Sequence, residues 1–267
     1  MLFDKVLVPV DLSEVSANQV SCVSKFHDYG MKEAIILFVS GDDVTVDQRE
    51  KLDSLAQQCS TEASGARVLI EKGKPSATIL KVAKREKATM LVMASSGKTK
   101  AKELMVGSVS LDVVRNAKVP VLVGKFATDR PTCPMLMDSV LVSLDLGPCT
   151  KGIMNVFKEM DTCGCKKAVL FHVVPSNKFS VEDDRKFQDV KKDLGKWKDS
   201  HDGICSIDTH LHYGTAAYNI MEAAREFNST LIVMGNVGKG LFHSMTLGSV
   251  SDEVLRKGNV HVLIVPV

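Results

Sequence analysis

Short apolar runs alternate along the chain with longer segments in which apolar residues recur every three or four positions. Residues 5–10 form a valine-rich run that is typical of a buried strand. Residues 13–27 carry apolar side chains at intervals of three, which predicts a helix with Ser13 as its N-cap. Further strands are predicted at 34–40, 66–71, 90–94 and 119–125, and further helices at 44–64, 76–86 and 108–116. This alternation favours an α/β fold.

The same pattern occurs twice. Residues 4–11 (DKVLVPVD) return as residues 138–145 (DSVLVSLD), and residues 107–123 agree with residues 248–264 at 9 of 17 positions. The offset between the copies rises from 134 to 141, which places about seven extra residues between the second and third strands of copy two. We therefore predict two tandem domains, residues 1–126 and 138–267, joined by a linker at 127–137 that contains two prolines.

Five strands joined by four helices predict a doubly wound parallel sheet with helices on both faces in each copy. In such sheets, ligands bind outside the carboxyl ends of the strands, where the strand order reverses. A chain of 267 residues is long enough for two domains of this kind.

Composition narrows the range of functions. The net charge is +2 and aromatic residues make up 5% of the chain, so neither a basic field nor a stacking platform predicts a nucleic-acid partner. The longest apolar run, residues 34–39, is far shorter than a membrane span requires. The N-terminus lacks the features of a secretory signal, and the 7 cysteines follow no pattern, which favours reduced thiols and a cytoplasmic location.

The loop after the fourth strand of each copy carries the candidate chemistry. In copy two, Gly235 begins the spacing Gly-x2-Gly-x9-Gly-Ser, which ends at Ser249. Copy one has the same spacing with Ala94 in the first position. The final Gly-Ser opens a predicted helix, whose unpaired N–H groups and partial positive charge suit a phosphate group.

This spacing, found twice in the corresponding place, resembles the nucleotide loop of the universal stress protein family. The first strand ends in Pro-x-Asp at Asp11, and the last strand has the Val-Pro-Val type of that family. The resemblance covers both copies nearly end to end. It implies a five-stranded parallel sheet and the binding of ATP or AMP, which Mg²⁺ could accompany. Other members of the family lack the glycines and bind no nucleotide.

The resemblance also implies which residues meet the nucleotide. The aspartate after strand one meets the ribose or adenine, a valine closing strand two lines the adenine slot, and the loop after strand four takes the phosphates. In copy one the corresponding residues are Pro9, Val10, Asp11, Val39, Met93, Ala94, Gly97, Gly107, Ser108, Val109 and Ser110. In copy two they are Ser143, Leu144, Asp145, Val173, Met234, Gly235, Gly238, Gly248, Ser249, Val250 and Ser251.

Both copies depart from the family pattern. Alanine at 94 is strained if that position needs a positive φ, and Ser143 stands where copy one has Pro9. The loop of copy one is basic, with three lysines available to phosphates, whereas that of copy two contains apolar residues that could close over a ligand or fill the slot. These residues are Lys98, Lys100 and Lys102 in copy one and Leu241, Phe242 and Met245 in copy two.

Three functions therefore stay open. The first is a cytoplasmic stress-response protein that binds adenine nucleotide and acts as a sensor or regulator without turnover. The second is an interaction module of the same fold that binds no nucleotide. The third is an enzyme that hydrolyses ATP or transfers an adenylyl group, for which Glu103 is the only carboxylate in the loop of copy one. We expect no enzyme, with weak ATP hydrolysis left open.

The fifth strands, within residues 119–123 and 260–264, are short, β-branched and at the end of each predicted sheet. An apolar edge strand invites pairing, and in the resembling family this strand makes the dimer. We therefore predict that the two repeats pack on each other through strand five. Pairing of two tandem chains into a homodimer is a further option.

Overall fold

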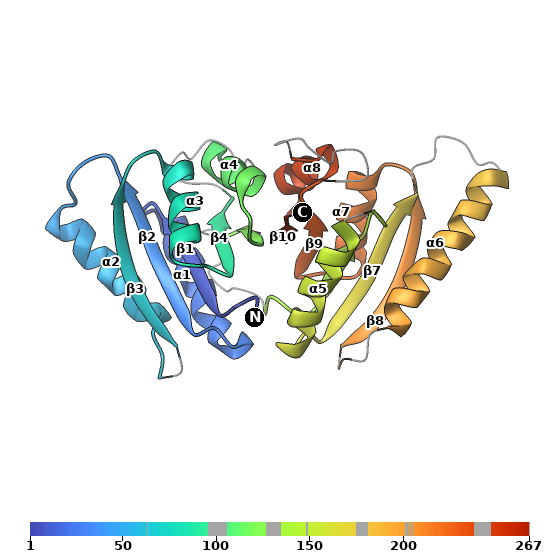
Figure 1. Ribbon diagram of the computed structural model, residues 1–267, viewed down its shortest axis with the longest axis horizontal. Coiled ribbons are helices and arrows are strands. Elements are labelled where there is room, and N and C mark those ends of the chain that lie inside the picture. The colour runs from blue at the N-terminus through green and yellow to red at the C-terminus, as the bar shows by residue number, and fades with distance from the viewer. Residues whose placement is uncertain are drawn as a thin grey trace. The chain divides into compact units, whose positions relative to one another are not determined.

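The computed structural model describes residues 1–62, 64–95, 106–126, 135–147, 149–174, 181–200, 203, 205–237 and 247–266, and of residues 181–187 it describes the backbone alone. The chain divides into two compact units, Met1–Cys133 and Pro134–Val267. Each unit is a parallel five-stranded sheet with helices on both faces (Figure 1). The predicted fold class is therefore confirmed.

The first unit follows the predicted order of strands and helices. Its elements are β1 (Lys5–Val10), α1 (Glu14–Val23), the 3-10 turn η1 (Ser24–Tyr29), β2 (Glu33–Ser40), α2 (Val46–Cys59), β3 (Gly65–Lys72), α3 (Pro75–Arg85), β4 (Met90–Ala94), α4 (Ser108–Asn116) and β5 (Val121–Gly124). The second unit repeats them as β6 (Val140–Ser143), α5 (Cys149–Thr162), β7 (Lys167–Val174), α6 (Val181–Asp199), β8 (Ser206–Tyr213), α7 (Ala216–Glu226), β9 (Leu231–Gly235), α8 (Ser249–Lys257) and β10 (His261–Val265).

The strand order is the same in both units. It runs β3-β2-β1-β4-β5 in the first unit and β8-β7-β6-β9-β10 in the second, and the pairs within each sheet are parallel. The chain moves outward from β1 to β3 and then returns to the other side of β1, so the order reverses between β1 and β4. In the second unit it reverses between β6 and β9. These two points are where ligands bind in doubly wound sheets.

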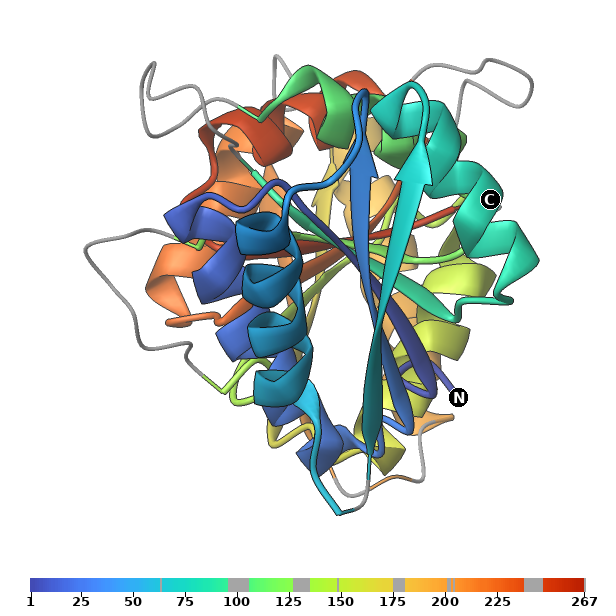
Figure 2. The same cartoon turned by 90° about the vertical axis from the view of Figure 1, so that its left-hand side faces the viewer.

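The helices form two layers in each unit because the chain crosses over in opposite directions on the two sides of β1. In the first unit α1 contacts α2 and α3 contacts α4, and Figure 2 shows the blue helices of 14–59 on one side of this sheet and the teal α3 on the other. The core lies between these layers and is made by strand residues such as Leu7, Ile36 and Leu91, which have no exposed surface.

Local chemistry fixes several helix boundaries. Ser13 caps α1 by accepting a hydrogen bond from the Ser16 N–H, so the predicted N-cap is confirmed. The predicted helix over 13–27 is shorter, because the chain tightens into η1 after Val23. The extra residues of copy two lie between β7 and β8, where α6 has 19 residues against 14 in α2.

The structure also bears on two expectations from composition, the absence of a membrane span and the reduced state of the thiols. No helix in the described ranges is long and apolar enough to cross a membrane. The expectation of reduced thiols is wrong at Cys22, which is disulfide-bonded. The odd number and irregular spacing of cysteines in the sequence do not exclude a bridge. The packing of the repeats through strand five stays a prediction.

Candidate functional site

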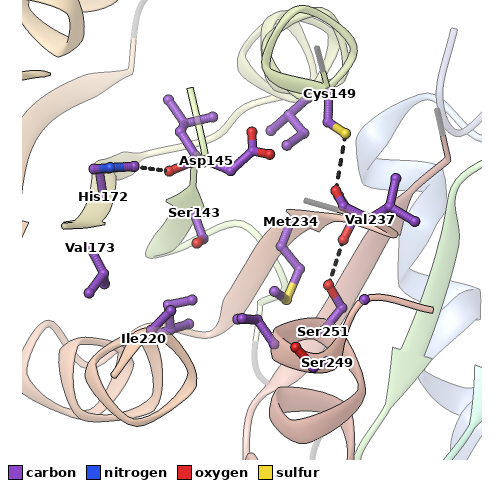
Figure 3. Close-up of a pocket in the computed structure, with 16 residues that line it drawn as sticks. Ser143, Asp145, Cys149, His172, Val173, Ile220, Met234, Val237, Ser249 and Ser251 are labelled. Carbon is purple, nitrogen blue, oxygen red and sulfur yellow. Dashed lines mark hydrogen bonds between the residues drawn. The ribbon is translucent and has the colours of Figure 1, made fainter. Parts of the chain in front are cut away.

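Each unit has a cavity at the carboxyl end of its sheet, at the point where the strand order reverses. The cavity of the first unit is about 530 Å³ and that of the second about 410 Å³. Both volumes lie in the range of small-ligand pockets. Figure 3 shows the second cavity, with Asp145, Met234 and Ser249 arranged around it.

The described residues predicted from the family resemblance all line these cavities. The first is lined by Pro9, Val10, Asp11, Val39, Met93, Ala94, Gly107, Ser108, Val109 and Ser110. The second is lined by Ser143, Leu144, Asp145, Val173, Met234, Gly235, Gly248, Ser249, Val250 and Ser251. The structure thus brings together side chains from three strand ends and one helix start in each unit. Gly97 and Gly238 lie outside the described residues, as do the lysines and apolar residues of the two loops.

Further cavity residues were not predicted from the sequence. The third helix of each unit contributes a wall, made by Pro75 and Ile79 in the first unit and by Ala216 and Ile220 in the second. These pairs stand at the same repeat offset as the two loops, and the apolar stripe of the helix is the signal that could have found them.

The first helix of each unit contributes a different side chain to each cavity. Gln19 lines the first cavity, and at the corresponding position Ile153 lines the second. The amide of Gln19 donates to the carbonyl of Val92 at 2.7 Å, and its Oε1 is buried without a hydrogen-bond partner among the described residues. The first cavity therefore offers a buried acceptor where the second is apolar.

The helices that follow the long loops begin at the cavities, and no side chain among the described residues caps them. Gly248 is the N-cap of α8, and no side chain caps the helix by a hydrogen bond. The N–H of Gly248 donates to the carbonyl of Asn236 at 2.8 Å, so the residue itself is fixed. The N–H groups of the next three residues have no acceptor within the helix. Gly107 and α4 repeat this arrangement, with Gly107 donating to Ser95 at 2.7 Å.

Glycine at these N-caps is not required by backbone conformation. Gly107 has φ −65° and Gly248 has φ −60°, which any residue adopts. Among the described residues, a Cβ built on Gly107 would meet only the carbonyl oxygen of Ser95, at 4.0 Å, so these residues do not explain the glycine there by packing.

The predicted strain at Ala94 is not found. Neither Ala94 nor its counterpart Gly235 is among the described residues with a positive φ. Glycine at 235 is instead favoured by packing, because a Cβ there would lie 3.2 Å from both the Cβ of Cys149 and the carbonyl oxygen of Val237. Alanine at 94 therefore needs no positive φ.

The aspartate that ends the first strand is held by the turn after it. Asp11 Oδ1 accepts hydrogen bonds from the Ser13 N–H at 3.0 Å and from the Ser16 hydroxyl at 2.6 Å. In the second unit, Asp145 Oδ1 accepts from the Gly147 N–H at 2.9 Å and from the Thr150 hydroxyl at 3.3 Å. Both carboxylates are thus oriented from one side.

In the second unit the other carboxylate oxygen, Asp145 Oδ2, is not engaged by the turn. Asp145 Oδ2 is buried and accepts no hydrogen bond from any described residue. A buried acceptor without a donor is costly, and such groups in native structures usually have a ligand or water to satisfy them. Since Asp145 lines the cavity, a donor group on a bound molecule can fill this role.

The turn that places the aspartate is strained in both units. Leu12 follows Asp11 with φ 62°, and Leu146 follows Asp145 with φ 54°. A leucine in the left-handed region costs about 1 kcal/mol or more, and such residues gather at functional sites. The sequence repeats the leucine, but its residue type gives no indication of this conformation.

Two other polar groups line the second cavity. His172 Nδ1 donates to the carbonyl of Leu144 at 2.5 Å, which fixes the imidazole beside the end of β7. The Cys149 thiol donates to the carbonyl of Val237 at 3.1 Å, and burial together with the charge of Asp145 raises the pKa of this thiol (Figure 3). Cys149 is therefore a protonated hydrogen-bond donor and not a nucleophile at neutral pH.

Among the described residues no group of three or more His, Cys, Asp or Glu side chains is arranged to hold a metal ion.

Comparison with known proteins agrees with this geometry. The model of the universal stress protein family matches residues 2–125 and 167–266, which is most of the chain. The chain belongs to the universal stress protein family. The unmatched stretch between these segments contains β6 and Asp145, where copy two departs from the family pattern in sequence while keeping the same strand and turn in structure.

Similar proteins of this family are single repeats and whole tandem chains. Two universal stress proteins of Methanocaldococcus jannaschii are 24% identical over 156 residues and 27% identical over 143 residues, covering 47% and 46% of this chain and 96% and 83% of those proteins. The structure of a universal stress protein from Archaeoglobus fulgidus is 26% identical with a TM-score of 0.71, and the match covers 100% of this chain and 99% of that one. A putative universal stress protein from Pseudomonas aeruginosa, 16% identical, has a TM-score of 0.74 over 99% and 93% of the chains and so shares the fold.

Proposed function

We propose that this universal stress protein binds an adenine nucleotide in the cavity of each unit and acts as a sensor or regulator without turnover. The observation that carries the proposal is the Asp145 Oδ2 atom, which has no hydrogen-bond partner among the described residues and lines the same cavity as the start of α8, where no side chain of those residues caps the helix. A nucleotide supplies a matching group at each end. Its ribose hydroxyls or adenine amine donate hydrogen bonds, and its phosphates accept them.

The two groups differ in what they recognise. The start of α8 presents N–H donors and the positive end of the helix dipole, which favour a phosphate over a neutral group. The Asp145 carboxylate accepts hydrogen bonds and repels anions, so it favours the ribose or base side of the ligand. Val173, Ile220 and Met234 supply apolar surface for a planar base.

Binding without catalysis is the simpler proposal for this site. Asp145 Oδ1 is engaged by the Gly147 N–H and the Thr150 hydroxyl of the turn, which suits a fixed binding group. Turnover would need a general base or a metal beside the phosphates. Sustained release of phosphate or AMP from ATP by the purified protein, well above a buffer blank, would replace this part of the proposal with an enzyme.

A first experiment asks whether adenine nucleotide co-purifies. The protein is denatured, the extract is separated by anion exchange, and the nucleotide is quantified per chain. Titration calorimetry with AMP and ATP on the stripped protein then gives the stoichiometry, expected at two per chain. No nucleotide in the extract and no heat on titration would favour an interaction module that binds none.

The decisive variant is Asp145→Asn. Asparagine keeps an oxygen for the Gly147 and Thr150 bonds but replaces Oδ2 with an amide group that cannot accept. We expect the affinity of the second site to fall at least tenfold, because a hydrogen bond to a charged group contributes about 1.5–3 kcal/mol. Asp208→Asn, at an exposed position of β8, is the matched control and should leave both sites unchanged. Equal affinities for the two variants would remove Asp145 from the binding site.

A further inference from the structure

A pair of buried thiols lies at the end of the second sheet opposite to the cavity. Cys165 precedes β7 and Cys205 precedes β8, and their Sγ atoms are 3.2 Å apart. Both are unbridged, and they are only 3% and 7% exposed. Forty residues of sequence separate them, so the sheet alone brings them together.

The backbone around this pair is fixed by hydrogen bonds. The Ser206 N–H donates to the carbonyl of Lys166 at 3.2 Å, which ties the start of β8 to the start of β7. The Cys205 N–H donates to the carboxylate of Asp161 at 2.7 Å, and Asp161 is itself buried. The sulfur atoms, 3.2 Å apart on this fixed backbone, therefore have to approach by only about 1.2 Å to reach the roughly 2.05 Å of a disulfide.

We propose that Cys165 and Cys205 are an oxidisable pair that hydrogen peroxide converts reversibly into a disulfide. Peroxide is a small oxidant, which suits thiols with so little exposed surface. The proposal does not depend on nucleotide binding, because the pair and the cavity lie at opposite ends of the strands.

The electrostatics of the pair distinguish the two sulfur atoms. The hydrogen bond with Cys165 lowers the pKa of Cys205, against burial and the Asp161 carboxylate, which raise it. The same hydrogen bond, with burial, raises the pKa of Cys165. Attack by the Cys205 thiolate gives the same disulfide as attack by the Cys165 thiolate, because the two sulfur atoms lie within 3.2 Å of each other.

The reaction balances in two steps. The Cys205 thiolate attacks one oxygen of hydrogen peroxide, the O–O bond breaks, hydroxide leaves and a sulfenic acid forms on Cys205. The Cys165 sulfur then attacks the sulfenic sulfur, the S–O bond breaks and the oxygen leaves as water with the proton from Cys165. Two thiols lose two electrons in all, and one peroxide becomes two waters. A dithiol reductant reverses the change by thiol–disulfide exchange.

The bond would link the starts of β7 and β8 and close a loop that contains α6. Closing a loop of about 40 residues restricts the unfolded chain, and for a unit of this size we expect a rise in melting temperature of roughly 5–15 °C. Oxidation would therefore stabilise the edge of the second sheet without adding a residue to the cavity.

The test uses the full chain, reduced and then treated with hydrogen peroxide. Unreacted thiols are alkylated after denaturation, and tryptic peptides are analysed by mass spectrometry. Trypsin leaves Cys163 and Cys165 on one peptide, so the Cys163→Ser variant is analysed beside the natural chain. We expect a cross-linked pair of peptides containing Cys165 and Cys205 in both proteins, cleaved again by dithiothreitol.

The variants Cys165→Ser and Cys205→Ser are expected to lose the cross-link and the oxidation-dependent rise in melting temperature, while Cys163→Ser keeps both. Fragmentation of the cross-linked peptide from the natural chain tells Cys165 from Cys163 and decides the question even if a serine variant does not fold. Full alkylation of Cys165 and Cys205 after peroxide treatment would overturn the proposal, and so would a cross-link from Cys163 to Cys205.

Discussion

The hydroxyl of Ser251 donates a 2.7 Å hydrogen bond to the backbone carbonyl of Gly235. This bond joins the first turn of α8 to the end of β9, on opposite sides of the long loop. Ser110 makes the same bond to Ala94 at 2.8 Å in the first unit. Both hydroxyls thus hold the helix start against the strand. The backbone N–H groups of the two serines are the donors that can bind a ligand.

We expect Ser251→Ala to destabilise the second unit. The bond is buried, and removing its donor leaves the Gly235 carbonyl with one partner fewer, at a cost of about 1–3 kcal/mol. Ser249→Ala removes an equivalent hydroxyl two residues earlier that holds no such bond among the described residues, and it should leave stability within about 0.5 kcal/mol. Urea unfolding of both variants measures the difference. Equal midpoints would show that the Ser251 bond contributes nothing.

Ser249→Pro tests the helix start as a phosphate site. Ser249 is the first residue of α8, where proline is tolerated because its missing N–H has no acceptor within the helix. Gly248 has φ −60° and ψ 143°, a conformation that a following proline permits. The fold should therefore persist while one N–H donor is lost.

The expected result of this change is a weaker second site, with at least a fivefold loss of affinity for AMP or ATP measured by calorimetry. Ser249→Ala separates the contribution of the hydroxyl from that of the N–H. Adenosine, which has no phosphate, should bind both variants alike. A proline variant that binds ATP as tightly as the natural chain would show that α8 does not hold the phosphates.

Much of this architecture was predictable because the deciding signals are local or repeated. Strand and helix periods, the cap at Ser13 and the twofold glycine spacing each depend on neighbours within one element, and the repeat supplied each of them twice. Topology predicted the edge of the sheet at which a ligand binds, because parallel strands bring their carboxyl ends together there. The individual lining residues, Asp11 and Asp145 among them, came from the resemblance to the universal stress protein family.

The rest depends on contacts between residues distant in sequence. Leu12 and Leu146 adopt a left-handed conformation that their residue type disfavours, and only the surrounding turn imposes it. The 3.2 Å approach of Cys165 to Cys205 depends on the pairing of β7 with β8. The spacing of the glycines predicted Gly235, but the packing reason for a glycine there is the close approach of Cys149, which lies far away in the sequence.

An acid-sensitive ion cluster covers part of the first sheet. Glu33 accepts hydrogen bonds from Lys5 at 2.8 Å and Arg67 at 2.6 Å. Burial raises the pKa of Glu33, but these two bonds outweigh it and hold the pKa below its ordinary value of 4.5. The contribution of the cluster is therefore present above pH 4.5 and is lost as the pH falls through the lowered pKa.

We expect Glu33→Gln to flatten the fall in stability of the first unit below about pH 4.5. The effect at neutral pH should stay near or below 1 kcal/mol, because the cluster is partly exposed and screened by solvent. Glu50→Gln, at an exposed position of α2, is the matched control. Denaturant unfolding at pH 3, 4, 5 and 7 supplies the comparison. Identical pH profiles for Glu33→Gln and the natural chain would contradict this account.

Cys59 should report the opening of the first unit. Its side chain has no exposed surface, its thiol contacts the carbonyl of Val20 at 3.6 Å, and burial raises its pKa to about 12. The folded chain at pH 8 then holds Cys59 as an unreactive thiol, whereas the half-buried Cys163 reacts with iodoacetamide. We expect alkylation of Cys59 to be at least a hundredfold slower than that of Cys163, and to accelerate in urea in step with unfolding. Because the unfolded state loses the thiol proton first, the contribution of Cys59 to stability should fall as the pH rises above 9.0. Mass spectrometry of tryptic peptides over time gives both rates, and comparable rates for the two cysteines without urea would show that Cys59 of α2 is not packed against α1 in solution.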